Sequence, residues 1–147
     1  MTKRVEEERQ DLAASEVGHV DEAMPEKTPD YVLLPGDPNR VSKMAAQWDE
    51  GAKLYTLSRS MTAAVGTYQG AEIGAWCTGI GGPSAAIAIE ELFMIGITNF
   101  VRVGTSGGMQ MNVMAGDIVV VQAAVRAEGT SREYMPIEWP APANFDY

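Results

Sequence analysis

Residues 72–108 read EIGAWCTGIGGPSAAIAIEELFMIGITNFVRVGTSGG, and this stretch decides the fold class. An apolar run of the β type enters a glycine-rich turn, a helical pattern follows, and a second apolar run enters another glycine-rich turn. In the helical part, Ala88 and Leu92 share one face, and Glu90 and Glu91 are expected on the other. This order of elements predicts an α/β fold.

The same kinds of element are expected on both sides of this stretch. Upstream we expect a strand over residues 31–34, a helix over 38–48, and antiparallel strands over 55–58, 62–68 and 72–78 with a turn at Gln69-Gly70. Downstream we expect a buried strand over 99–103 and a long apolar strand, covered on both faces, over 117–125. No element is expected after Gly129. Residues 1–30 are interpreted as a polar N-terminal arm and residues 31–147 as part of a single domain.

The composition of the 147-residue chain argues against several classes of function. Its 11 basic and 20 acidic side chains give a formal net charge of −9, which disfavours binding to nucleic acid phosphates. The apolar runs are too short or too charged to span a bilayer and no signal peptide is seen, so we expect a cytoplasmic protein. Because Cys77 is the only cysteine, no intramolecular disulfide or cysteine-based metal site is expected, and Cys77 is expected in the core.

Three glycine-rich turns follow predicted strands, at residues 35–40, 79–84 and 104–108. The carboxyl ends of strands and the N-termini of helices present backbone N–H groups, so these turns are expected to form an anion site. Arg40 belongs to the first turn, and Arg102 and Thr105 flank the start of the third. No turn is a standard nucleotide fingerprint, so the pattern alone leaves two interpretations open. The turns either bind phosphate or a phosphorylated ligand, or are tight turns beside solvated or paired arginines.

Four motifs resemble the nucleoside phosphorylase family: LPGDPNRV at 34–41, TGIGGPS at 78–84, VRVGTSG at 101–107 and VRAEGT at 125–130. The second and fourth motifs look more like the uridine phosphorylases than the bacterial purine enzymes. The resemblance implies a three-layer α/β/α sandwich with a central mixed β-sheet. It also implies phosphorolysis of a nucleoside, most of all uridine, with inorganic phosphate as co-substrate and with no cofactor or metal.

The resemblance also implies roles for particular residues. Gly36, Arg40, Arg102 and Thr105 fall on the family's phosphate-binding positions, and Arg59 matches an arginine that reaches the phosphate site of a neighbouring subunit. Arg40, Arg59 and Arg102 are the expected catalytic residues, although Arg59 can also be read as an ordinary exposed arginine.

Nucleoside contacts are implied for Thr105, Ser106 and Gly107, with a plain turn as the alternative for the last two. His19 lies where the family places a histidine that reaches the partner's ribose, and its alternative is a solvated surface histidine. These cross-subunit roles imply a homo-oligomer built of dimers, by family analogy a hexamer.

The sequence also departs from the family. This sequence does not contain the family's Gln/Arg pair that reads the pyrimidine or its Glu-Met-Glu segment that holds the ribose hydroxyls. We therefore expect that the sheet is incomplete and that this chain alone is inactive. In the family, an acidic residue at the position of Ser60 lies beside a bound cation. Because Ser60 is not acidic, no metal is expected. Three other functions remain open: a same-fold nucleosidase, which uses water and has no need of the three arginines, a purine nucleoside phosphorylase, and a non-catalytic nucleoside-binding or assembly module.

Overall fold

The computed structural model describes residues 29–144, which divide into two compact units, one through Gly104 and one from Thr105 onward. Each unit is described by itself. The expected polar arm, apart from its last two residues, and His19 lie outside the described residues. The interpretation of residues 31–147 as part of a single domain stays a prediction.

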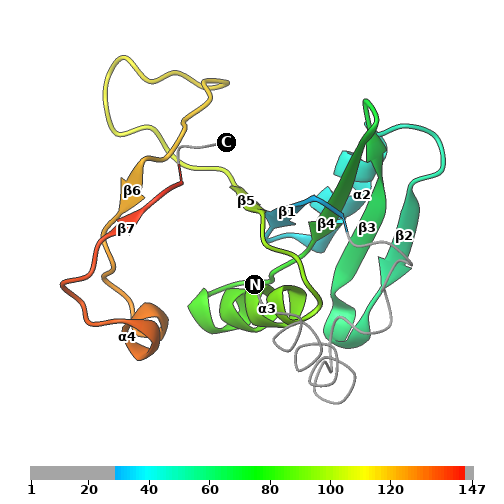
Figure 1. Ribbon diagram of the computed structural model, residues 1–147. Coiled ribbons are helices and arrows are strands. Elements are labelled where there is room, and N and C mark those ends of the chain that lie inside the picture. The colour runs from blue at the N-terminus through cyan, green and yellow to red at the C-terminus, as the bar shows by residue number, and fades with distance from the viewer. Residues whose placement is uncertain (1–28, 145–147) are drawn as a thin grey trace. The chain divides into compact units, whose positions relative to one another are not determined.

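A five-stranded sheet forms the centre of the first unit (Figure 1). Its strands are β1 (Tyr31–Pro35), β2 (Lys53–Thr56), β3 (Thr62–Tyr68), β4 (Ala71–Trp76) and β5 (Phe100–Val103), in the order β2-β3-β4-β1-β5. Strands β2, β3 and β4 pair antiparallel, whereas β1 pairs parallel with both β4 and β5. The sheet is therefore mixed, as expected. The β3–β4 turn at Gln69 and Gly70 has positive φ angles of 51° and 84°, the conformation that a tight hairpin requires.

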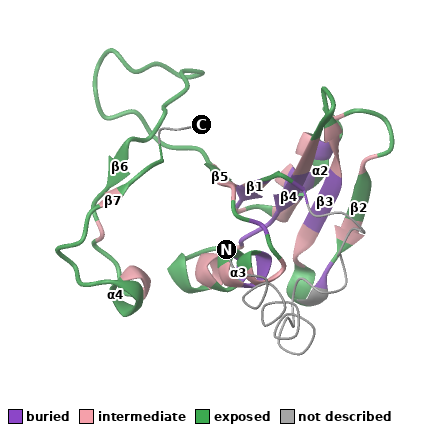
Figure 2. Cartoon of the chain, viewed as in Figure 1, coloured by how far each residue is buried: buried purple, intermediate pink, exposed green. Residues whose placement is uncertain are grey.

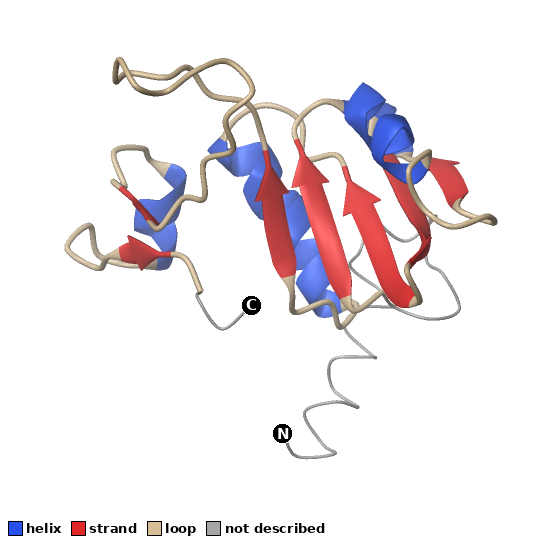
Figure 3. Cartoon of the chain, turned by 90° about the horizontal axis from the view of Figure 1, so that it is seen from above, coloured by secondary structure: helices blue, strands red, loops and turns tan. Residues whose placement is uncertain are grey.

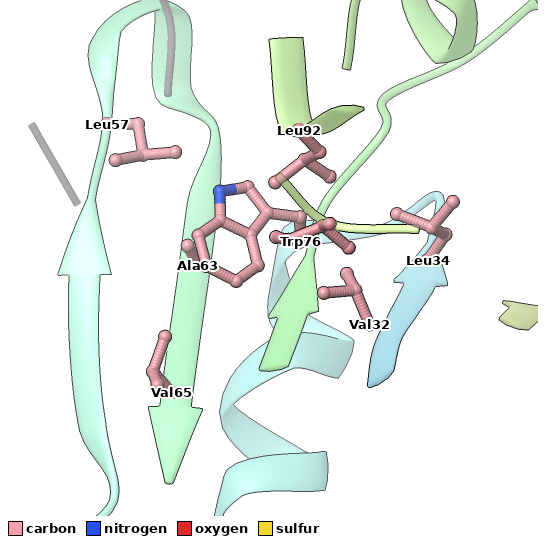
Figure 4. Packing of buried hydrophobic residues seen from close by; sticks show 8 residues of the cluster. Val32, Leu34, Leu57, Ala63, Val65, Trp76 and Leu92 are labelled. Carbon is pink, nitrogen blue, oxygen red and sulfur yellow. The ribbon is translucent and has the colours of Figure 1, made fainter. Parts of the chain in front are cut away.

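Helices α2 (Pro38–Ala45) and α3 (Gly82–Met94) pack on opposite faces of this sheet (Figure 1 and Figure 3). Because successive strand residues point to opposite faces, Val32 and Leu34 pack with Leu92 of α3, while Leu33 between them packs with Val41 of α2. Figure 4 shows Trp76 at the centre of the α3-side cluster. The first unit therefore has the expected α/β/α layers.

Two predictions about burial in the first unit are wrong. The strand expected over residues 99–103 to be buried is half-buried or exposed in β5, because this strand has β1 as its one neighbour among the described residues. Glu91 was expected on the outer face of α3, yet it is only 8% exposed. It follows Ala88 by three residues, so helical geometry places it on the face that packs against the sheet.

The second unit contains α4 (Thr130–Tyr134) and a two-residue antiparallel pair, β6 (Ala123–Ala124) with β7 (Ala141–Pro142). Only β6 lies within the long buried strand expected over residues 117–125, so that prediction is wrong; Ile118 and Val120 are 92% and 80% exposed. An apolar run becomes a strand only where another strand accepts and donates its hydrogen bonds, and β7 pairs with just two residues. The helix α4 and strand β7 were not expected. Within residues 29–144, no helix is long and apolar enough to cross a membrane.

Candidate functional site

A hollow of about 660 Å³ opens at the carboxyl ends of β1 and β4. Its lining residues are Gly36, Asp37 and Pro38 after β1, Gly79, Ile80 and Gly81 after β4, and Arg102 from β5. These three strands are parallel neighbours, so their carboxyl ends meet at one edge of the sheet. The structure therefore brings together the first two glycine-rich turns and Arg102. Residues 105–108 of the third turn belong to the second unit, so the expectation that all three turns form one anion site stays a prediction.

The guanidinium of Arg102 is fixed at this edge by two hydrogen bonds. Its Nη1 donates to the carbonyl oxygen of Leu34 at 2.7 Å and to Oγ1 of Thr78 at 3.3 Å. Arg102 as a residue is exposed, but these bonds hold its positive charge beside the hollow. A fixed guanidinium in a concave site suits an anionic ligand with several oxygen atoms.

Two glycines of the hollow are required because neighbouring atoms lie too close to leave room for a side chain, and one of them also because of its backbone conformation. An ideal Cβ on Gly36 would lie 3.1 Å from the carbonyl oxygen of Gly79 and 3.3 Å from Nη2 of Arg102. Gly79 has a φ of +67°, and a Cβ there would lie 2.8 Å from Oγ of Ser84. Side chains at these two positions would push the turns and the guanidinium apart.

Thr78 connects the two turns through hydrogen bonds. It was not identified as a site residue from the sequence. Its side chain is 2% exposed, and its backbone N–H donates to the carbonyl oxygen of Pro35 at 2.9 Å. Ser84 in turn donates its hydroxyl to the carbonyl oxygen of Thr78 at 2.5 Å. The neighbouring Cys77 is buried, as expected, with its Sγ 3.5 Å from the carbonyl oxygen of Gly36.

Helices α2 and α3 both begin at the hollow. Asp37 caps α2, and its Oδ1 accepts from the backbone N–H of Asn39 at 2.9 Å and from its Nδ2 at 3.1 Å. This carboxylate is thereby held to the positive N-terminus of α2. Gly81 is the N-cap of α3 and supplies no side-chain cap, so the first N–H groups of α3 have no side-chain acceptor there.

Arg40 and Arg59 do not line this hollow. Arg40 is half-buried in the first turn of α2. Arg59 is exposed in the 3₁₀ turn Ser58–Ser60 between β2 and β3, where its φ is 56°. Strand pairing places that turn at the same edge of the sheet as the hollow, at the ends of β2 and β3 and separated from β1 by β4. The phosphate-binding roles of both arginines stay predictions.

The remaining predicted residues of the described chain belong to the second unit. Ser106 and Gly107 line a separate hollow of about 500 Å³, whose other lining residues lie between positions 108 and 119. Thr105 is exposed and is not part of that lining. Their roles at phosphate and nucleoside stay predictions, as does the role of His19.

The second unit is organised around Arg126. Its guanidinium donates to Oγ of Ser131 and to four backbone carbonyl oxygens, those of Ser131, Met135, Pro136 and Trp139. Glu128 accepts the backbone N–H groups of Thr130 and Ser131 at 2.7 and 2.8 Å, at the start of α4. We call Arg126, Glu128 and these bonded groups the Arg126 clamp. Its residues were noticed in the sequence only for their family resemblance.

Comparisons with known proteins agree with this geometry. A family model described as the phosphorylase superfamily matches residues 30–147. The chain is 48% identical to the uridine phosphorylase of Thermococcus kodakarensis over 116 residues, covering 79% of this chain and 42% of that protein. It is 43% identical to the uridine phosphorylase of Treponema pallidum over 134 residues, covering 91% and 47%.

Among solved structures, a uridine phosphorylase from Vibrio fischeri superposes with a TM-score of 0.79 at 34% sequence identity, covering 92% of this chain and 55% of that one. The chain spans about half the length of the curated relatives it matches.

Proposed function

The chain belongs to the phosphorylase superfamily, and from this premise we propose that it acts in the phosphorolysis of a nucleoside, with uridine as the preferred substrate. A phosphate oxygen forms a bond to C1′ of the sugar while the bond between C1′ and the base breaks. The base leaves with the electron pair and takes up the proton that the phosphate gives up, so that uridine and phosphate become uracil and ribose 1-phosphate. The observation that carries the proposal is the hollow in which Arg102 is fixed beside Gly36.

The residues of the hollow suit this chemistry. Arg102 supplies a fixed positive charge for phosphate, and Gly36 leaves room for an anion at the carboxyl end of β1. Bound phosphate beside C1′ would stabilise the positive charge that grows on the sugar as the bond to the base stretches. Catalysis then comes from positioning and electrostatics, and needs no covalent step and no cofactor beyond phosphate as co-substrate.

The other predicted residues complete the proposed site. Arg40 and Thr105 add phosphate contacts, and Arg59 reaches the phosphate of a neighbouring subunit. Ser106 and Gly107 contact the nucleoside together with Thr105, and His19 reaches the ribose of the partner. The proposal therefore includes a homo-oligomer built of dimers, by family analogy a hexamer, that acts on small molecules in the cytoplasm.

Uridine is favoured as the nucleoside because the relatives in Thermococcus kodakarensis and Treponema pallidum are uridine phosphorylases. A nucleosidase of the same fold is the second candidate, since it would cleave the same bond with water. Arg102 favours phosphate over water, because a fixed guanidinium stabilises a bound anion much more strongly than a neutral water molecule.

The test uses the protein expressed from its complete reading frame. Uridine and inosine are each incubated with and without inorganic phosphate, and the free base and the sugar product are measured. We expect uracil and ribose 1-phosphate from uridine, at a rate that saturates with phosphate, and slower release of base from inosine. Free ribose at a rate independent of phosphate would instead identify a nucleosidase. Faster cleavage of inosine would identify a purine enzyme, and binding of uridine without turnover would identify a binding module.

A further inference from the structure

The guanidinium of Arg102 has five N–H groups, and among residues 29–144 those of Nη1 find acceptors. The acceptors of Nη1 are the carbonyl oxygen of Leu34 at 2.7 Å and Oγ1 of Thr78 at 3.3 Å. Within residues 29–144, Nε and Nη2 have no hydrogen-bond acceptor. One edge of the guanidinium is therefore anchored, and the edge formed by Nε and Nη2 is left for a ligand.

The anchored edge depends on a hydroxyl that is itself held in place. Thr78 is 2% exposed, and its Oγ1 lies 3.4 Å from the carbonyl oxygen of Pro35 and 3.5 Å from that of Gly79. A hydroxyl has one hydrogen to donate, so it can satisfy one of these carbonyls and still accept from Nη1 of Arg102. The backbone of Thr78 is fixed on both sides, through Pro35 and through Ser84.

The hollow lies where the Nε–Nη2 edge is accessible. Both Gly36 and Arg102 line it, and Nη2 would lie 3.3 Å from a Cβ on Gly36, the atom whose absence leaves space there. Two N–H groups on one edge of a planar guanidinium match two oxygens of a phosphate in a bidentate pair.

We propose that Thr78 is the positioning residue of the phosphate site: its hydroxyl holds Nη1 of Arg102 so that Nε and Nη2 bind two oxygens of inorganic phosphate. This inference rests on the proposed phosphorolysis and adds to it a residue that does not itself touch the substrate. Thr78 acts on phosphate through Arg102, so its loss affects phosphate binding before it affects nucleoside binding.

The decisive variant is Thr78→Val, which replaces the hydroxyl with a methyl group of nearly the same size. Of its two acceptors, Nη1 then keeps the carbonyl oxygen of Leu34, and the guanidinium can rotate away from the bidentate position. We expect the KM for phosphate to rise about tenfold, the effect of one lost hydrogen bond to a charged group, while the KM for uridine changes less than about twofold. Thr78→Ser retains the hydroxyl, and its KM for phosphate should stay within about threefold of that of the wild type.

The matched control is Thr62→Val at the start of β3, where a threonine of the same sheet makes no side-chain hydrogen bond to a described residue. Its KM for phosphate should equal that of the wild type. Thermal melting of each variant shows whether it folds, and Thr78→Ala replaces Thr78→Val if the buried methyl group prevents folding. A merely structural role of Thr78 would lower the melting temperature and kcat without raising the KM for phosphate.

Failure of the inference and failure of the proposed function give different results. If the wild-type rate does not depend on phosphate, the proposed function is wrong and the inference falls with it. If the wild type saturates with phosphate but a folded variant without the hydroxyl has an unchanged KM for phosphate, only the positioning role is overturned. A Thr78→Ser variant with the defect of Thr78→Val would overturn it as well.

Discussion

Among the described residues, every buried apolar side chain lies in the first unit, whereas the second unit exposes its apolar side chains (Figure 2). Val32 and Leu92 are 0% exposed in the first unit, while Ile118 and Val125 are each 92% exposed in the second. In the first unit, paired strands offer two faces, and a helix covers each face. In the second unit the strand pair is only two residues long, and the Arg126 clamp supplies the organisation.

This contrast explains why the hollow with Arg102 is the better-defined site. Its turns are continuous with β1 and β4, which belong to a packed sheet, so the positions of Gly36 and Gly79 follow from the core. The hollow beside Ser106 and Gly107 is formed by a chain with no buried residue between positions 105 and 144. Burial fixes the first site, and polar contacts alone hold the unit that contains the second.

The largest expected difference between the units is the effect of removing an apolar side chain. Leu92→Ala should lower the free energy of unfolding by about 3 kcal/mol, because it leaves a cavity between α3 and the sheet. Ile118→Ala should change it by less than about 0.5 kcal/mol, because Ile118 is already in solvent. Urea unfolding measures both variants. Equal losses would show that Ile118 is buried and that the two units do not differ in this way.

A smaller and more local effect is expected at the Arg126 clamp. Arg126→Lys keeps the charge but cannot bond four carbonyl oxygens, so the segment between α4 and Trp139 should open more easily, by about 2 kcal/mol. Hydrogen exchange of the backbone N–H groups of residues 131–139 measures this opening. Arg132→Lys is the control, since no hydrogen bond of its side chain to a described residue is seen. Unchanged exchange in Arg126→Lys would show that the clamp does not hold the segment.

The smallest effect concerns pH and the Glu128 carboxylate. Hydrogen bonds from Ser131, and then from Thr130, lower the pKa of Glu128 from 4.5 to about 2. Because the pKa is lower in the folded chain, the contribution of this carboxylate to stability is present above about pH 4.5 and is lost as the pH falls towards 2. NMR titration of the Glu128 side chain should give a midpoint near 2, and Glu128→Gln should remove the pH dependence of the N–H signals of Thr130 and Ser131. A titration midpoint near 4.5 would show that the Glu128 carboxylate does not accept these hydrogen bonds from Thr130 and Ser131.

The first unit could be predicted from the sequence because its signals are local. The strand over residues 31–34 and the turn at Gln69-Gly70 each depend on neighbouring residues, and each is confirmed. The glycine-rich turns also led to Gly36 and Arg102 as members of one site, because parallel strands bring their carboxyl ends to the same edge.

What could not be predicted depends on bonding partners that no local sequence pattern identifies. The composition of the apolar run at Ile118 indicates a strand, but the run itself gives no information on whether another strand is available to pair with it. Thr78 bonds Arg102, which is 24 positions away, and no local pattern marks such a contact. Arg126 bonds backbone carbonyl oxygens, which every residue carries, so its acceptors have no sequence signature.

If phosphate binds in the hollow of the first unit through Arg102, then Arg102→Ala should change how uridine cleavage depends on the phosphate concentration. We expect kcat/KM for phosphate to fall on the order of a hundredfold or more, because a charge-assisted contact that forms with the transition state is lost. Arg132→Ala, which removes an exposed arginine of the second unit, should keep the wild-type value within about twofold. Saturation of Arg102→Ala by phosphate at the wild-type KM and rate would show that phosphate does not bind through Arg102.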